Sequence, residues 1–239
     1  MNDDRMVAAP ADLPALSVRR PRGEVTGIAL VLHGGAERDS RRVHPWRLAY
    51  LRMVPFARDL FRTGGRHGLA VGLLRNRLRG WNEPALDPVV DTRWALERLR
   101  ADHPGVPIVL LGHSLGGRVA LRVADDPAVT GACALAPWTP IREPVEPVTS
   151  RRVLVAHGTK DRVTSAAESH AFCLRAAALA AGIVRFEVTD EGHSMLRRRA
   201  VWTRLARAFT LETLALPTTG NTLDGVWSKP EAERLRIRI

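Results

Sequence analysis

The stretch Pro107-Ile-Val-Leu-Leu-Gly112-His113-Ser114-Leu115-Gly116-Gly117 decides the fold of this chain. Its apolar run predicts a strand, and the segment 118–124 directly after it predicts a helix. A turn this sharp needs glycines beside the serine, because a Cβ at Gly112 or Gly116 would clash with the neighbouring strand or helix. Ser114 would then lie at the tip of a strained turn, as a candidate nucleophile. The alternative is a glycine-rich turn with an ordinary solvent-facing serine.

An acidic residue follows a later strand-like run. Residues 152–158 are mostly apolar, and Asp161 comes shortly after them. Ligands of open α/β sheets bind at the carboxyl ends of the strands, so Asp161 is a candidate partner for the serine. An aspartate in this place is also typical of a turn, or of the cap of the helix predicted over 165–181.

A histidine follows the last full strand-like run. Residues 183–188 alternate like a strand, and Gly192 allows a tight turn that aims His193 back across the sheet edge. A loop histidine is more often a plain surface residue. Serine, acid and histidine, each just after a strand, nevertheless follow the chain order of α/β-hydrolases. Asp190 and Glu191 are rival acids.

The chain therefore resembles the α/β-hydrolase superfamily, over roughly His33 to His193. The segment His157-Gly-Thr-Lys-Asp-Arg-Val163 resembles that of compact serine esterases and of dienelactone-hydrolase-like or acyl-protein-thioesterase-like members. The resemblance implies an α/β-hydrolase fold, with a mostly parallel central sheet and helices on both faces. It also favours Asp161 over the rival acids, which lie too close to the histidine in sequence to match the family pattern.

The three residue types fit one reaction. A serine hydroxyl is a poor nucleophile at neutral pH, so His193 would take the proton of Ser114 and later give it to the leaving group. Asp161 would accept a hydrogen bond from the other ring nitrogen and stabilise the imidazolium. We thus expect Ser114, His193 and Asp161 to be the catalytic residues.

The tetrahedral intermediate needs backbone donors for its negative oxygen. The N–H of Leu115, at the start of the predicted helix, is one candidate. The other should follow an earlier strand, where His33-Gly34-Gly35 resembles the oxyanion loop of the family. The N–H of Gly35 is the first choice, and those of Gly34 and Ala36 are alternatives.

Apolar runs of strand character alternate with helical patterns along the chain, which favours a largely parallel sheet covered on both faces. The segments 13–19 and 25–32 are expected to be early strands with an antiparallel start, and 46–61 is expected to be one helix. Further strands are expected at 69–74, 129–136 and 152–157, and further helices at 89–99, 198–214 and 231–235. We expect a hydrolase domain over residues 1–215 and a loose basic extension over residues 216–239. The proline-rich segment 137–151 is too short for a large cap subdomain.

Substrate contacts are harder to predict. Trp138 and Trp81 are candidates for the walls of the site, although core packing is as common for a tryptophan. Arg75 and Arg77 follow a strand and belong to one of two arginine clusters, 38–42 and 75–79, that are expected near the site rim. We hypothesise that one cluster steers an anionic substrate, with ordinary solvated surface as the alternative.

Composition limits the remaining functions. The formal net charge is +11, but only two of the 36 basic residues are lysines and the arginines are spread along the chain without a nucleic-acid-binding motif. We therefore expect no nucleic acid partner. No apolar stretch is long enough for a membrane span, and the first ten residues do not resemble a signal peptide. With two cysteines, a cytoplasmic protein is expected.

The sequence thus predicts a serine hydrolase that cleaves a carboxylic ester or thioester through an acyl-enzyme, without a metal or organic cofactor. Its partner would be a small-molecule substrate, anionic if an arginine cluster contributes. A peptidase, a lactonase or an acyltransferase would use the same residues. A non-catalytic binding protein of the same fold is the alternative from another class. Substrate identity and oligomeric state are left open.

Overall fold

The computed structural model describes residues 13–218, 220 and 222–239. Parts of both predicted domains, residues 1–12, 219 and 221, lie outside the described residues. The described chain forms one eight-stranded sheet in the order β1-β3-β2-β4-β5-β6-β7-β8. The strands are β1 (Ala15–Arg19), β2 (Gly27–Leu32), β3 (Leu69–Arg75), β4 (Ile108–His113), β5 (Val129–Leu135), β6 (Arg152–Gly158), β7 (Gly182–Val188) and β8 (Ile237–Arg238). All neighbours are parallel except β1 and β3, so the predicted antiparallel start is β1, which pairs with β3 rather than with β2.

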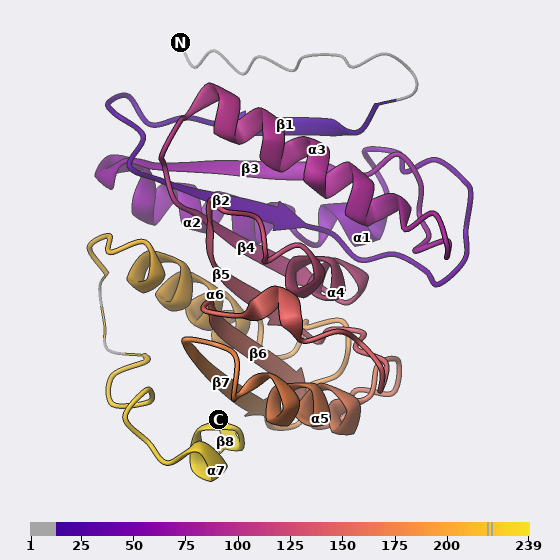
Figure 1. Cartoon of the computed structure of the whole chain (residues 1–239), viewed down its shortest axis with the longest axis vertical. Helices are drawn as coiled ribbons and strands as arrows, with labels where there is room; N and C mark the ends of the chain where they lie inside the picture. The colour runs from indigo at the N-terminus through magenta and orange to yellow at the C-terminus, as the bar shows by residue number, and fades with distance from the viewer. Residues whose placement is uncertain (1–12, 219, 221) are drawn as a thin grey trace.

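Helices cover both faces of this sheet, as the alternation predicted (Figure 1). They are α1 (Leu48–Leu51), α2 (Val54–Gly64), α3 (Asp87–Asp102), α4 (Leu115–Arg122), α5 (Ala166–Ala176), α6 (Arg199–Thr213) and α7 (Glu231–Arg234). Helices α3, α4 and α5 pack on one face, and α2 and α6 on the other. Each face therefore has its own apolar core.

The central strands separate these two cores. Every residue of β4 is buried, as expected for a strand covered on both faces. Leu110 belongs to the core beneath α3, α4 and α5, whereas Leu111 belongs to the core beneath α2 and α6. Successive strand side chains point to opposite faces, so an uninterrupted apolar run is needed to serve both cores.

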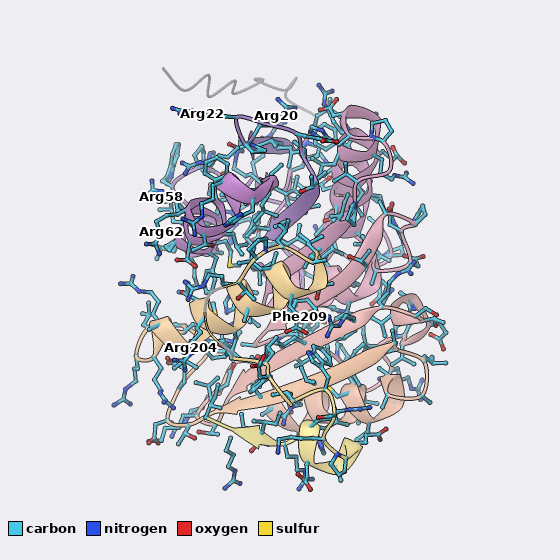
Figure 2. The ribbon with its side chains drawn as sticks, turned by 90° about the vertical axis from the view of Figure 1, so that its left-hand side faces the viewer. Arg20, Arg22, Arg58, Arg62, Arg204 and Phe209 are labelled. Carbon is cyan, nitrogen blue, oxygen red and sulfur yellow. The ribbon has the colours of Figure 1, made fainter. Side chains whose placement is uncertain are left out.

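The helices α2 and α6 are amphipathic. Figure 2 shows Arg58 and Arg62 of α2 and Arg204 of α6 at the outer surface, while Phe209 of α6 turns toward the sheet and is fully buried. These arginines thus lie on the solvated side of helices whose apolar side covers the sheet. No described helix is long and apolar enough to cross a membrane.

Two segments differ from the sequence predictions. The single helix expected over 46–61 is two helices, α1 and α2, and Pro55 lies in the first turn of α2. Proline has no N–H to donate to the preceding turn, so a new helix starts there. The helix expected over 165–181 ends at Ala176, and by Ala181 the chain has reached the sheet, where its N–H donates to the carbonyl of Arg151, just before β6.

The described part of the C-terminal segment packs on the domain rather than extending loosely from it. Its strand β8 adds to the sheet edge in parallel with β7. Leu223 and Leu235 are buried, and the guanidinium of Arg152 lies 4.3 Å from the ring centre of Trp227. Apolar residues spaced along this segment therefore cover the edge that β7 would otherwise expose.

The connection from β5 to β6 carries no large cap. Residues 136–151 are fully described and contain one 3-10 turn, Glu146–Val148. Glu143 from this connection points inward and is buried against α4. This connection thus adds a loop, not a helical subdomain, at the carboxyl edge of the central strands.

Candidate active site

Ser114 lies in the tight turn between β4 and α4. Its φ is 56°, a left-handed conformation that a residue with a side chain rarely adopts. A Cβ on Gly112 would lie 2.0 Å from the carbonyl oxygen of Gly116, and a Cβ on Gly116 would lie 2.6 Å from the carbonyl oxygens of Leu32 and His33. Backbone atoms thus exclude any side chain at both glycines, as the sequence pattern predicted.

A chain of hydrogen bonds joins three side chains that are distant in sequence. The hydroxyl of Ser114 lies 3.0 Å from Nε2 of His193, which can accept its proton. The Nδ1–H of His193 donates to Oδ2 of Asp161 at 2.8 Å. The loop after β4 carries the serine, the loop after β6 the aspartate, and the loop after β7 the histidine. The residues that the sequence singled out therefore meet at one edge of the sheet.

The carboxylate of Asp161 is held from several sides. Its side chain is fully buried, and Oδ1 accepts the backbone N–H groups of Val163 and Thr164 at 2.8 and 3.0 Å. Oδ2 also accepts the hydroxyl of Thr164 at 3.0 Å and lies 3.3 Å from Nε2 of His157. Burial alone would raise the pKa of this carboxyl, but the hydrogen bonds from two histidines and two backbone N–H groups outweigh it and hold the pKa well below its ordinary value.

The two rival acids are engaged elsewhere. Asp190 pairs with Lys160 at 2.8 Å on the surface, and this contact lowers its pKa. Glu191 is buried and accepts the backbone N–H of Arg198 at 2.6 Å, just before α6. Their side chains make no hydrogen bond with the ring of His193 within the described residues.

His113, which sequence reasoning did not single out, supports the site. Its Nε2–H donates to the backbone carbonyl of His193 at 2.9 Å, and the two rings lie 4.8 Å apart. Burial lowers the pKa of His113 to about 3, so the ring is neutral at physiological pH. Its place next to Ser114 in the sequence was the only available signal, and that place does not show which backbone group the ring would reach.

His33 organises the loop after β2. Its Nδ1–H donates to the carbonyl of Gly34 at 2.7 Å, and its Nε2 accepts the backbone N–H of Asn76 at 3.1 Å. Both ring nitrogens are thus used by the neutral form, and burial lowers the pKa of His33 to about 4. The loop is therefore tied to the end of β3 by a ring without charge.

The backbone donors near Ser114 differ in availability. The N–H of Ala36 donates to the carbonyl of Arg79 at 2.9 Å and is thus occupied. Among the described residues, no acceptor takes the N–H of Leu115, Gly34 or Gly35. Gly34 is close as well, since a Cβ there would lie 3.3 Å from Cβ of Ser114.

The predicted substrate contacts divide into two pairs. The N–H of Trp138 donates to the carbonyl of Ser114 at 3.2 Å, and the ring of Trp81 lies edge-on to that of Trp138. The two arginines are held by other groups. Arg75 donates to the carbonyl of Val43 at 2.7 Å, and Arg77 pairs with a buried aspartate of α3 at 2.5 Å. Substrate contact by any of the four stays a prediction.

A cleft of about 590 Å³ lies between α4, the β5–β6 connection and the loops after β2 and β3, and Ser114, His193 and Asp161 are not among its lining residues. Trp81 and Trp138 line it, and the guanidinium of Arg118 contacts both rings, 3.8 and 4.3 Å from the ring centres. Arg118 also pairs with Glu143 at 2.6 Å. The cleft thus combines aromatic walls with buried charge. The described residues contain no cluster of three or more His, Cys, Asp or Glu side chains with the arrangement of a metal site.

Comparison with known families gives one partial match. The model of the family described as serine aminopeptidase, S33, matches residues 67–152. The matched segment contains Ser114 and ends before Asp161 and His193. None of the curated proteins compared matches the chain.

Solved structures resemble the chain over most of its length. An alpha-beta serine hydrolase homologue from Coxiella burnetii is 18% identical with a TM-score of 0.65, covering 87% of this chain and 97% of the other. Est1E from Butyrivibrio proteoclasticus is 15% identical with a TM-score of 0.62, covering 84% and 95%. The esterase domain of a Rhodothermus marinus protein is 15% identical with a TM-score of 0.60, covering 84% and 92%. At these identities the likeness concerns the fold.

Proposed function

We propose that this chain is a member of the α/β-hydrolase superfamily, whose fold it has, and that it is a serine hydrolase. It would cleave a carboxylic ester or thioester through an acyl-enzyme intermediate. The observation that carries this proposal is the continuous hydrogen-bond chain from the hydroxyl of Ser114 through the ring of His193 to the carboxylate of Asp161, with distances of 3.0 and 2.8 Å. A serine, an imidazole and an ionised carboxylate in this order are the parts that nucleophilic acyl transfer needs.

The reaction would proceed in two halves. His193 takes the proton of Ser114 through Nε2 while Oγ attacks the substrate carbonyl carbon, and it then gives that proton to the leaving oxygen or sulfur. The acyl group remains on Oγ. Water, deprotonated by the same ring, then attacks the acyl carbon. The ring returns this proton to Oγ as the bond to the acyl carbon breaks and the acid leaves. Asp161 keeps the proton of the ring on Nδ1 and stabilises the imidazolium of each half.

The negative oxygen of each tetrahedral intermediate would receive two backbone hydrogen bonds. We assign them to the N–H groups of Leu115 and Gly35, which have no acceptor within the described chain. Leu115 is the first residue of α4, so the partial positive charge of the helix N-terminus adds to its donor. Each such donor is worth about 3 kcal/mol of transition-state stabilisation.

A peptidase is the second candidate, because the partially matching family model is described as one of serine aminopeptidases. An aminopeptidase has to bind a free ammonium group, which calls for an excess of carboxylates at the site. The cleft that contains Trp81 and Trp138 is lined by four arginines and three glutamates. This excess of positive charge favours the ester or thioester.

We also propose a cytoplasmic location. Cys133 and Cys173 are buried and unpaired, and burial raises the pKa of both thiols. Free thiols fit a reducing compartment.

A fluorophosphonate probe tests the proposed function directly. Such a probe phosphonylates an activated serine, so it should label the wild type and not Ser114→Ala. Ser194→Ala is the matched control, since Ser194 adjoins His193 in sequence and makes no side-chain hydrogen bond among the described residues. Labelling of Ser194→Ala should equal that of the wild type. A folded wild type that remains unlabelled would instead favour a non-catalytic binding protein.

A substrate panel then separates the hydrolase classes. We expect turnover of short acyl esters or thioesters, and a much slower reaction with aminoacyl anilides that carry a free amino group. Preferential cleavage of those anilides would assign the chain to the peptidases. Faster transfer of the acyl group to an added alcohol than to water would indicate an acyltransferase.

A further inference from the structure

Arg118, one helical turn after the candidate nucleophile, is held by several contacts. Its side chain is 8% exposed, and its Nε donates to Glu143 at 2.6 Å. The guanidinium carbon lies 3.8 Å from the ring centre of Trp81 and 4.3 Å from that of Trp138, and these two rings meet edge-on. An arginine clamped in this way loses little further conformational entropy when it binds a ligand.

The outer edge of this guanidinium is unused. Nη1 and Nη2 of Arg118 have no hydrogen-bond acceptor among the described residues. Neither atom is among the buried side-chain atoms without a partner, so both are accessible to solvent. Arg118 lines the cleft, so these two groups face it. Two parallel N–H donors on one rigid edge match the two oxygens of a carboxylate.

The charge around Arg118 calls for one anion. Glu143 is fully buried and is shared by Arg118 and Arg122, whose Nη2 lies 2.6 Å from it. Two guanidiniums and one carboxylate leave one positive charge in excess in this poorly solvated wall. Glu83 at the rim interacts electrostatically with Arg118 but makes no hydrogen bond with it. A ligand with one negative charge would therefore neutralise the cluster.

The position of Arg118 links this edge to the reaction centre. Arg118 follows Ser114 by one turn of α4, and its backbone N–H donates to the carbonyl of Ser114 at 3.1 Å. The backbone N–H of Trp138, whose ring contacts the guanidinium, donates to the same carbonyl. Both residues are thus tied to the backbone of Ser114, and a substrate that reaches from Ser114 into the cleft would bring a group to this edge.

We propose that the Nη edge of Arg118 binds a carboxylate of the substrate, so that the ester or thioester cleaved here carries one carboxylate a few bonds from its reacting carbonyl. This inference rests on the proposed function and names the substrate class of the same site. Two of the arginines in the clusters that the sequence suggested for this task pair with carboxylates, Arg77 with Asp91 and Arg41 with Asp39.

Matched substrates test the proposal. One pair carries the charge on the acyl group, as mono(4-nitrophenyl) glutarate and its primary amide. The other carries it on the leaving group, as 4-acetoxybenzoate and its amide. We expect kcat/KM of the wild type to favour the anion in at least one pair. Arg118→Met should lower that preference by about 10- to 100-fold, the loss typical of hydrogen bonds to a charged group. Glu143 keeps its contact with Arg122 in this variant.

Two further variants separate contact from general charge. Arg38→Met removes a charge from the exposed rim of the cleft and should change the preference by less than about threefold, since exposed charges are screened. Glu83→Gln removes the rim carboxylate near Arg118 and should increase the preference for the anion. The preference of the wild type should survive 0.5 M NaCl. Equal losses in the Arg38 and Arg118 variants, abolished by salt, would overturn the proposal in favour of long-range steering.

A binding measurement without turnover completes the test. Glutaranilate and 4-hydroxybenzoate, each compared with its primary amide, are titrated into Ser114→Ala by calorimetry. At least one acid should bind more tightly than its amide, and Arg118→Met in the same background should abolish the difference. If the wild type is labelled by the fluorophosphonate and cleaves neutral esters, but no acid is preferred in turnover or binding, this inference is wrong and the proposed function stands. If the probe does not label the folded wild type, the proposed function fails, whatever the calorimetry shows.

Discussion

His113 and His193 are joined by a hydrogen bond from a ring to a backbone. Nε2 of His113 lies 2.9 Å from the carbonyl oxygen of His193, which can only accept, so the proton of His113 is on Nε2. Nδ1 of His113 is buried without a partner. The residue that precedes the candidate nucleophile thus holds the backbone of the candidate base, which fixes where the base approaches Ser114.

This relationship makes His113 a positioning residue. Phenylalanine at position 113 keeps a ring but lacks the donor, so we expect His113→Phe to lower kcat by about tenfold, the value of one net hydrogen bond, with KM nearly unchanged. His113→Gln retains an N–H donor and should recover part of the loss. Steady-state kinetics on a neutral ester measure both. A change confined to KM would contradict the positioning role.

Substitutions of Asp161 and Asp190 test which aspartate orients His193. Asp161→Asn removes the carboxylate that orients His193, and we expect kcat to fall by about 10⁴-fold, as for the equivalent change in a serine protease. Asp190→Asn alters a surface ion pair with Lys160 and should leave kcat within about twofold. Circular dichroism verifies the fold of each variant. A strong loss in the Asp190 variant alone would make Asp190 the functional acid.

Gly112 tests the steric argument for the turn. A methyl group at this position would overlap the backbone of Gly116, so we expect Gly112→Ala to destabilise the protein by more than about 3 kcal/mol. Gly23→Ala is the control, because a Cβ there meets no atom within 4 Å. Chemical denaturation measures both free energies of unfolding. A Gly112 variant as stable as the Gly23 variant would show that the backbone relaxes.

Two buried histidines predict a pH dependence of stability. Burial lowers the pKa of His33 to about 4 and that of His113 to about 3, whereas both are near 6.5 in the unfolded chain. Between these values the unfolded state binds protons that the folded state does not. The contribution of the two histidines to the free energy of unfolding should therefore be complete above about pH 6.5. It should fall as the pH drops toward 4, by at most about 2.7 kcal/mol per pH unit for the pair.

Urea titrations at pH 7.5, 6.0 and 5.0 measure this slope. His33→Gln, which does not titrate in either state, should remove close to half of the contribution of the pair. A stability that stays flat from pH 7.5 to pH 5.0 would mean that neither ring is buried in the neutral form.

Arg77 is expected to stabilise the fold. Its guanidinium pairs with Asp91, which is 1% exposed, so Arg77→Met would leave a buried carboxylate without its counter-charge. We expect a loss of about 3 kcal/mol in the free energy of unfolding. Arg98→Met, an exposed change on the same helix as Asp91, should change it by less than about 0.5 kcal/mol. A stable Arg77 variant with altered ester selectivity would restore Arg77 as a substrate contact.

Local patterns allowed much of this fold to be predicted. The strand before Gly112 could be predicted because a strand buried on both faces needs apolar residues throughout. The turn at Ser114 could be predicted because no Cβ fits at its two glycines. The α/β-hydrolase fold expected from these motifs is confirmed. The pairing partners of the edge strands could not be predicted in this way. That β1 joins β3 and that β8 joins β7 depends on which edge remains open after the central strands assemble.

The sequence by itself determined the sharp turn at Ser114 and the order in which serine, acid and histidine follow their strands, since both depend on neighbouring residues. Only the tertiary structure decided which groups meet across long separations. It placed His113 against the carbonyl of His193, and it packed the guanidinium of Arg118 against two tryptophans. Such contacts depend on the packing of loops from different strands, because a side chain finds its partner in space rather than along the chain.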